Sequence, residues 1–274
     1  MRLALRPITR EIILLSILFV FTALMSSKSD VQAPNGLEIM TRVDQRDDGD
    51  DQQSTALFQL VNKRGQKRLR HTVRLWKDYD GADGLDAKMI TFFQSPPDVK
   101  GTGFLSWSYV AGEKDDDQWL YLPALRKVRR IASSDKGDSF MGTDFTYDDM
   151  GERKVEEDNH TLLRSEPLRD ADCYVVDSVP KKEGYIYSKK ITWVDKANWI
   201  PLKVDYYDRK GRLLKTLETE WQIVNGIWSW LQAEMKNHLT GHKTLIEIKD
   251  VKVNTGLANR TFTKRTLEKG VRRR

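Results

Sequence analysis

Turn signals about fifteen residues apart divide the C-terminal half of the chain into long segments of alternating polarity. Asp208-Arg209-Lys210-Gly211, Asn225-Gly226 and Thr240-Gly241 supply the signals, and Asn-Gly is the strongest short-range signal for a hairpin. The segments between them, residues 213–224, 228–239 and 243–253, each have about a dozen residues, whereas strands usually have about five or six. Strands this long, joined by tight turns, predict a broad curved antiparallel sheet.

The N-terminal half shows the same period of two. Ala56, Phe58 and Leu60 alternate before a turn at residues 62–65. In the next segment one face carries Leu69, Val73 and Leu75, and the other carries Arg68, Arg70 and Arg74. If the arginine face points outward, it excludes lipid, which argues against an outer-membrane barrel as a further alternative. Alternation of this kind is typical of strands with one covered face.

Further strands are expected between these two regions. Helix signals are few: an amphipathic segment at residues 36–43, a capping pattern starting at Thr146, and a final turn capped by Thr263 with Phe262 and Leu267 as its hydrophobic staple. The fold class is therefore mainly β (α+β), with a few short helices. The additional strands are expected at residues 88–94, 102–109, 118–122, 127–132, 161–165, 173–179, 187–194 and 202–207.

Residues 1–33 have the pattern of a signal peptide. Arg2, Arg6 and Arg10 precede an apolar run at residues 12–25, which is shorter than the ~20 residues of a membrane span. We expect cleavage near residue 27 or 33 and export to the periplasm as a soluble monomer, with an uncleaved N-terminal anchor as the alternative. Residues 34–268 are then one domain and 269–274 a basic tail.

Composition excludes several classes of protein. Charged residues make up 31% of the chain and the mean hydropathy is −0.59, which excludes a helical protein with several membrane spans. Eight Trp, nine Tyr and nine Phe are too many large apolar residues for a disordered chain. The single cysteine, Cys173, has no partner for an internal disulfide and lies far from the expected cleavage sites, so it offers no N-terminal lipid attachment point.

No motif indicates catalysis, a metal or a cofactor. His238 and His242 have ligand-like spacing but flank the Thr240-Gly241 turn, and the acidic clusters lack the order of a calcium loop. We therefore expect neither an enzyme nor a metal or cofactor site. The basic residues at 126–130 suit a solvated face or an anionic lipid headgroup. Without residues 1–33 the net charge falls from +6 to +4, which is too small to indicate nucleic acid in an exported protein.

Residues 138–150, Asp-Ser-Phe-Met-Gly-Thr-Asp-Phe-Thr-Tyr-Asp-Asp-Met, resemble the signature segment of the periplasmic outer-membrane lipoprotein-sorting-like family, the relatives of LolA that often accompany RND (MMPL-type) exporters. The remaining matches cover most of the chain beyond the signal. They lie at residues 100–105, 118–123, 126–131, 200–203, 207–211 and 262–267. The resemblance implies a LolA-like fold, in which a curved antiparallel sheet forms an unclosed barrel around a cavity for acyl chains.

The resemblance also implies a function, a periplasmic carrier that binds a lipid or lipidated protein for transfer between membranes or with an RND-type exporter. The alternative is a non-carrying adaptor of an exporter, in which the sheet is only a scaffold. Apolar residues on the strands suit a core or a cavity equally, and those in the signature segment equally suit a lid or a loop that is ordered only for stability. The candidate cavity and lid residues are Phe58, Leu60, Val73, Leu75, Phe92, Phe104, Trp119, Tyr121, Phe140, Phe145, Tyr147, Trp193, Trp221 and Trp228.

Overall fold

Thirteen strands form one antiparallel sheet in the computed structural model, which describes residues 33–112 and 114–270. The predicted signal peptide lies outside the described residues except for Ala33, and so do the last four residues of the predicted basic tail. The strands are β1 (Asp51–Val61), β2 (Lys67–Asp78), β3 (Leu85–Ser95), β4 (Gly103–Tyr109), β5 (Asp117–Leu122), β6 (Lys127–Arg130), β7 (Asp158–Leu168), β8 (Ala171–Pro180), β9 (Lys189–Asp195), β10 (Pro201–Tyr207), β11 (Leu213–Val224), β12 (Ile227–Asn237) and β13 (Lys243–Val253).

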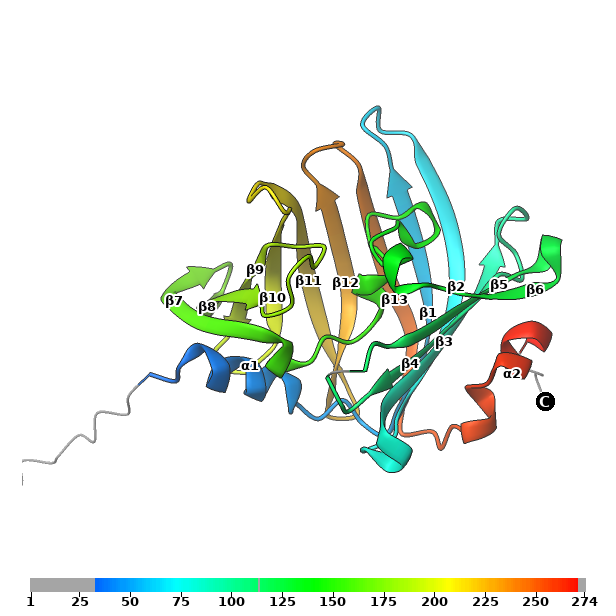
Figure 1. Cartoon of the computed structure of the whole chain (residues 1–274), viewed down its shortest axis with the longest axis horizontal. Helices are drawn as coiled ribbons and strands as arrows, with labels where there is room; N and C mark the ends of the chain where they lie inside the picture. The colour runs from blue at the N-terminus through cyan, green and yellow to red at the C-terminus, as the bar shows by residue number, and fades with distance from the viewer. Residues whose placement is uncertain (1–32, 113, 271–274) are drawn as a thin grey trace, which may run out of the picture. The chain divides into compact units, whose positions relative to one another are not determined.

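The sheet is open. Its strand order is β6-β5-β4-β3-β2-β1-β13-β12-β11-β10-β9-β8-β7, so β6 and β7 form its two edges and do not pair with each other within the described chain. Among the paired strands of the described chain, β1 and β13 are the only neighbours that lie far apart in the sequence. All other neighbouring strands follow one another along the chain. Figure 1 shows the sheet curving, so the expected unclosed, mainly antiparallel architecture is confirmed.

The predicted turns form the hairpins. Asn225 and Gly226 both have positive φ, 50° and 86°, as a two-residue hairpin turn requires. The two flanking strands pair in register from Val224 with Ile227, through one bulge, to Lys215 with Asn237. Long alternating strands and tight turns therefore produce this half of the sheet as expected.

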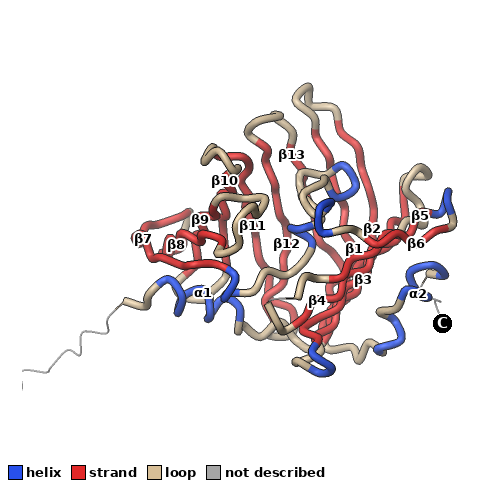
Figure 2. The backbone as a smooth tube through the Cα atoms, viewed as in Figure 1, coloured by secondary structure: helices blue, strands red, loops and turns tan. Residues whose placement is uncertain are grey.

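One face of the sheet, the concave face, is covered by residues 131–157, which connect β6 to β7 and which we call the cover segment. Its helical parts are single 3-10 turns, and Figure 2 shows that most of it is loop. Phe140 and Phe145 from this segment are buried against Phe58, Phe93 and other residues of the sheet. The helix α1 (Gly36–Asp44) covers the part of the same face formed by β7 and β8.

The opposite, convex face is covered by α2 (Lys264–Lys269), which contacts β4, β5 and β6. Phe262 and Leu267 are buried there, as the predicted staple requires, and the Thr263 side chain accepts a hydrogen bond from the backbone N–H of Thr266. The row below the helix runs across paired positions of β3, β4 and β5, namely Ile90, Leu105 and Trp119. Among the helices described, none has the length and apolarity needed to cross a membrane.

Helix α1 approaches the sheet so closely that its first residue has to be small. A Cβ added to Gly36 would lie 2.6 Å from the backbone of His160 and Thr161 in β7. The Asn35 side chain caps the helix, and Ile39 is fully buried against Val176 and Val194.

We predict that Gly36→Ala destabilises the fold by about 1–3 kcal/mol through overpacking, although alanine favours helix more than glycine. Chemical denaturation measures the change. Leu37→Ala is the matched control, because Leu37 is 53% exposed, and we expect a change within about 0.5 kcal/mol. Equal effects of the two substitutions would contradict this account of the close approach.

Candidate functional site

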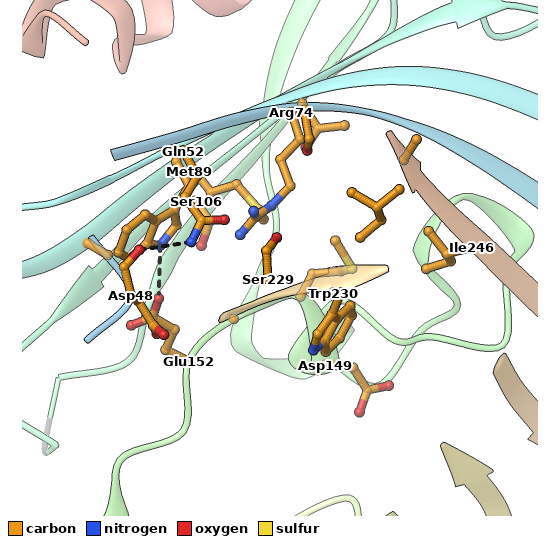
Figure 3. Close-up of a pocket in the computed structure, with 18 of the residues that line it drawn as sticks. Asp48, Gln52, Arg74, Met89, Ser106, Asp149, Glu152, Ser229, Trp230 and Ile246 are labelled. Carbon is orange, nitrogen blue, oxygen red and sulfur yellow. Dashed lines mark hydrogen bonds between the residues drawn. The ribbon is translucent and has the colours of Figure 1, made fainter. Parts of the chain in front are cut away.

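A cavity of about 350 Å³ lies between the concave face and the cover segment. Strands β1 to β4 and β11 to β13 contribute to its walls, the cover segment contributes Phe145 and residues 149–152, and the link after α1 contributes Arg46 and Asp48. Figure 3 shows Arg74 and Met89 on one side of this space, and Trp230 and Ile246 on another. Residues far apart in the sequence therefore enclose one space.

The lining combines apolar side chains with small polar ones. The apolar part includes Phe58, Trp76, Met89, Phe145, Trp230 and Ile246. The small and hydroxyl-bearing part includes Ser54, Ala56, Thr72, Thr91, Ser106 and Ser229. Small side chains at the centre of a wide sheet leave volume that larger ones would fill, and a mainly apolar pocket with a few polar groups is typical of small-molecule sites.

A buried ion pair fixes the cover segment to the sheet. Lys215 of β11 and Asp149 of the cover segment meet at 2.5 Å, with side chains 2% and 4% exposed. The Lys215 ammonium also donates to the Asp144 carbonyl at 3.1 Å, and the Tyr187 hydroxyl donates to Asp149 at 2.9 Å. Burial alone raises the pKa of Asp149, but the charge and hydrogen bond of Lys215 outweigh it and hold that pKa below its usual value.

Hydrogen bonds at other positions also connect the cover segment to the sheet. The Thr244 hydroxyl donates to the Asp144 carboxylate at 2.8 Å, and the Gln118 amide donates to the Tyr147 carbonyl at 2.9 Å. The Arg70 guanidinium donates to the Met141 carbonyl. A segment with little regular structure must satisfy its buried backbone groups in this way, so the sheet determines where the cover lies.

The signature segment supplies the turns of the cover. Thr146 and Asp149 cap each other, since the Asp149 carboxylate accepts from the Thr146 N–H at 2.7 Å and the Thr146 hydroxyl accepts from the Asp149 N–H at 3.1 Å. The predicted capping pattern thus forms a 3-10 turn at Asp148–Met150. Phe140 is fully buried with its ring edge against Phe104, with centroids 5.1 Å apart.

A second charged group closes the cavity beside Trp76. Glu152 accepts hydrogen bonds from the Ser108 hydroxyl at 3.0 Å and from the Trp76 indole at 3.4 Å. Burial, together with the nearby carboxylate of Asp86, raises the pKa of Glu152 to about 7. The hydrogen bond from Glu152 and the contact with Lys154 lower the pKa of Asp86, so Asp86 stays ionised while Glu152 takes up a proton as the pH falls through about 7.

The candidate residues from the sequence divide between the two faces. Those on the concave face that line the cavity are Phe58, Phe145, Trp221 and Trp228. Leu60, Phe104, Phe140 and Tyr147 belong to the apolar cluster on the same face. Leu75, Phe92, Trp119 and Tyr121 pack on the convex face with α2, and Val73 pairs with Phe92 on that face. Trp193 packs with Cys173, Val175 and Ile191 in a separate cluster.

At Arg74 the arginine face of β2 points into the fold, whereas Arg68 on the same face is exposed. Arg74 is on the same register row as Thr91, Phe104 and Leu120, which is the concave face, and it lines the cavity. At the level of Arg74 and Leu75 both faces of β2 are covered, because Leu75 packs on the convex side with residues of α2 and of the loop before it. Alternation in the sequence assigns residues to two faces of a strand but does not show which face lines a cavity. Arg74 therefore could not be identified as a site residue from this pattern.

Comparison with known proteins identifies a family and several similar crystal structures. The model of the DUF1329-like family, described as an uncharacterized protein, matches residues 85–269. A crystal structure described as an outer membrane lipoprotein-sorting protein domain, from Vibrio parahaemolyticus, is 36% identical, covers 85% of this chain and 98% of its own, and has a TM-score of 0.79. A DUF1329 family protein from Desulfovibrio piger is 34% identical, with coverages of 85% and 97% and a TM-score of 0.80.

A LolA superfamily protein from Nitrosomonas europaea has the same fold at 21% identity, with a TM-score of 0.66 over 85% of this chain and 99% of its own. The expected LolA-like architecture is thus confirmed. Among curated protein sequences, none matches the chain.

We predict that Lys215→Met destabilises the protein by about 3–5 kcal/mol near pH 7, because Asp149 is left charged and buried. In the native protein the pKa of Asp149 lies below its ordinary value of 3.8. Its ionised carboxylate therefore stabilises the fold above pH 3.8, and this stabilisation is lost as the pH falls from 3.8 through the lowered pKa. Without Lys215, burial raises the pKa of Asp149, and the variant then loses stability as the pH rises. The difference in stability between the native protein and Lys215→Met should therefore grow between pH 3 and pH 7. Urea denaturation at several pH values measures it.

The matched double variant, Lys215→Met with Asp149→Asn, should lose less stability than Lys215→Met alone. Lys210→Met, in an exposed turn, should change stability by no more than about 0.5 kcal/mol. A pH-independent loss in Lys215→Met would contradict the ion pair's role.

We also predict a pH-dependent gain from Glu152→Gln. Because the pKa of Glu152 is raised, its contribution to stability is present below its ordinary pKa of 4.5 and is lost as the pH rises through about 7. The amide removes this loss, so the melting temperature of the variant should exceed that of the native protein at pH 8 and equal it at pH 4.5. A gain of the same size at both pH values would rule out the titration of Glu152 as its cause.

Proposed function

The chain belongs to the DUF1329-like family and has the LolA-like fold, and from this we propose that it is a periplasmic carrier that binds a lipid or lipidated protein through its acyl chain. The observation that carries the proposal is the cavity of about 350 Å³ between the concave face and the cover segment. In this proposal the acyl chain lies among Phe58, Met89 and Ile246, while the cover segment shields it from water.

Apolar burial supplies the affinity. Each buried methylene contributes about 0.8 kcal/mol, so even part of a long chain gives binding strong enough to shield it and weak enough for transfer to an acceptor membrane. A volume of about 350 Å³ is near the lower end of ligand pockets, which span about 300–1,000 Å³. It favours a single chain over a cargo with several chains.

Export and transfer between membranes complete the proposal. The pattern of residues 1–33 supports export, and the description of the relative from Vibrio parahaemolyticus supports a role in outer membrane lipoprotein sorting. In this proposal the exported chain is a soluble monomer without enzymatic activity, and its partner in the inner membrane is an exporter of the RND/MMPL type.

The alternative, a non-carrying adaptor, requires an interior filled by side chains. The small residues Ser54, Ala56 and Thr91 at the centre of the concave face support a carrier instead, because they leave space where a scaffold would pack larger side chains.

We predict that Ala56→Trp lowers the affinity for a fluorescent fatty acid by at least about tenfold, because an indole occupies the cavity. Ala56 is only 9% exposed, so the variant should also lose about 1–3 kcal/mol of stability. Leu57→Trp is the matched control, since the adjacent side chain lies on the other face of β1. Fluorescence titration of the folded variants measures the affinities. Native affinity in Ala56→Trp, or no binding by the native protein, would refute the proposal.

A further inference from the structure

The inference concerns Arg74, and it rests on the proposed carrier function. Arg74 lies at the centre of β2 between the register partners Ser54 and Thr91. It lines the cavity, and Figure 3 shows its guanidinium projecting into this space toward Ser229. Arg74 lies deep in the fold and keeps an intermediate exposure, so the surface that it exposes faces the cavity.

The Arg74 guanidinium has no carboxylate partner in the part of the chain that the structure describes. Its Nε donates to the Met89 sulfur at 3.0 Å, which is a weak acceptor, and no carboxylate oxygen of a described residue lies within 4.0 Å of its nitrogens. Asp48 and Glu152 act on it only through their more distant charges. Since a guanidinium stays protonated in proteins, a positive charge with free N–H donors faces the cavity.

The other charged groups that line the cavity have partners in the protein. Arg46 pairs with Asp48 at 2.8 Å and lies over the Trp221 ring. Asp149 pairs with Lys215. Glu152 lies 3.5 Å from the Lys154 ammonium.

Lys88 lies over the Trp107 and Tyr79 rings, 4.2 and 4.5 Å from their centroids. Within the described lining, Arg74 is therefore the charge left to a ligand.

The cavity that Arg74 faces also carries hydroxyl groups. Ser54, Thr72, Thr91, Ser106 and Ser229 line the same cavity. An oxyanion placed against Arg74 would meet a planar guanidinium, which binds carboxylate or phosphate through two parallel N–H donors, and hydroxyls that complete its hydrogen bonds. The apolar residues Phe58, Phe145 and Ile246 remain for a chain.

We propose that the cavity binds a single-chain amphiphile with an anionic head, a carboxylate or a phosphate, whose oxygens pair with the Arg74 guanidinium while its chain lies along the apolar wall. The ligand enters as a preformed amphiphile and no covalent step is involved. The anionic head explains why a cavity for an apolar chain retains a desolvated cation.

The test is isothermal titration calorimetry of the full mature chain with palmitate, hexadecyl phosphate, hexadecanol and inorganic phosphate. Palmitate or hexadecyl phosphate, whichever has the recognised head, should bind at least about tenfold more tightly than hexadecanol, because a hydrogen-bonded charge pair is lost in the alcohol. The ratio between the two anionic amphiphiles identifies the head. Inorganic phosphate without a chain should bind at least about a hundredfold more weakly, because it lacks the apolar contribution.

Arg74→Met should reduce the preference over hexadecanol to about threefold or less while hexadecanol still binds, and Arg74→Lys should retain an intermediate preference. Arg70→Met is the matched control. Arg70 lies on the same strand and face but donates to the Met141 carbonyl of the cover, so its loss should change the affinities for all chains together and leave their ratio intact.

Equal binding of palmitate, hexadecyl phosphate and hexadecanol by the native protein would overturn this inference and leave the carrier function standing. A native preference that Arg74→Met retains, or tight binding of inorganic phosphate alone, would overturn it as well. Failure of every chain to bind would refute the carrier function itself. The comparison of ligands on the native protein needs no variant, so the inference is testable even if Arg74→Met fails to fold.

Discussion

The ion pair between Lys215 and Asp149 determines where the cover segment lies. Residues 131–157 contain only single helical turns, so their position depends on side chains that reach the sheet. Lys215 joins β11 to the cover at a carboxylate that also receives the Tyr187 hydroxyl and the Thr146 N–H. Removing two charges from water is costly, and the attraction and the surrounding hydrogen bonds offset that cost only when the geometry holds. The cavity lies under the cover segment, so its shape depends on the position that this ion pair gives to the segment.

The two faces of the sheet are covered in different ways. On the convex face, Phe262 and Leu267 of the C-terminal segment are fully buried against large side chains, and the packing is that of a core. On the concave face, the central positions carry small or hydroxyl-bearing residues such as Ser54 and Ala56, and the cover reaches across them from Phe140 and Phe145. A core on one side and a partly polar cavity on the other therefore share the same strands.

The sequence predicts the strands, their turns and both short helices because these depend on local patterns. Asn225-Gly226 forms the expected turn, and the staple of Phe262 with Leu267 forms as expected. The side on which each face lies depends on contacts between distant elements. The sequence alone does not show that Arg74 faces the cavity or that Trp119 packs on the convex face, because contacts of α2 and the cover segment, far away in sequence, decide which face is the cavity. The charge pairing in the cavity depends on the same tertiary contacts.

The central claim is that an acyl chain occupies the space between the concave face and the cover segment. A crystal structure of the protein with a bromine-labelled palmitate analogue tests it directly, because anomalous scattering locates the bromine. The account predicts a bromine peak inside the cavity, among residues such as Phe58, Met89 and Ile246. A peak on the convex face beside α2, or a cavity without the analogue at saturating concentration, would contradict it.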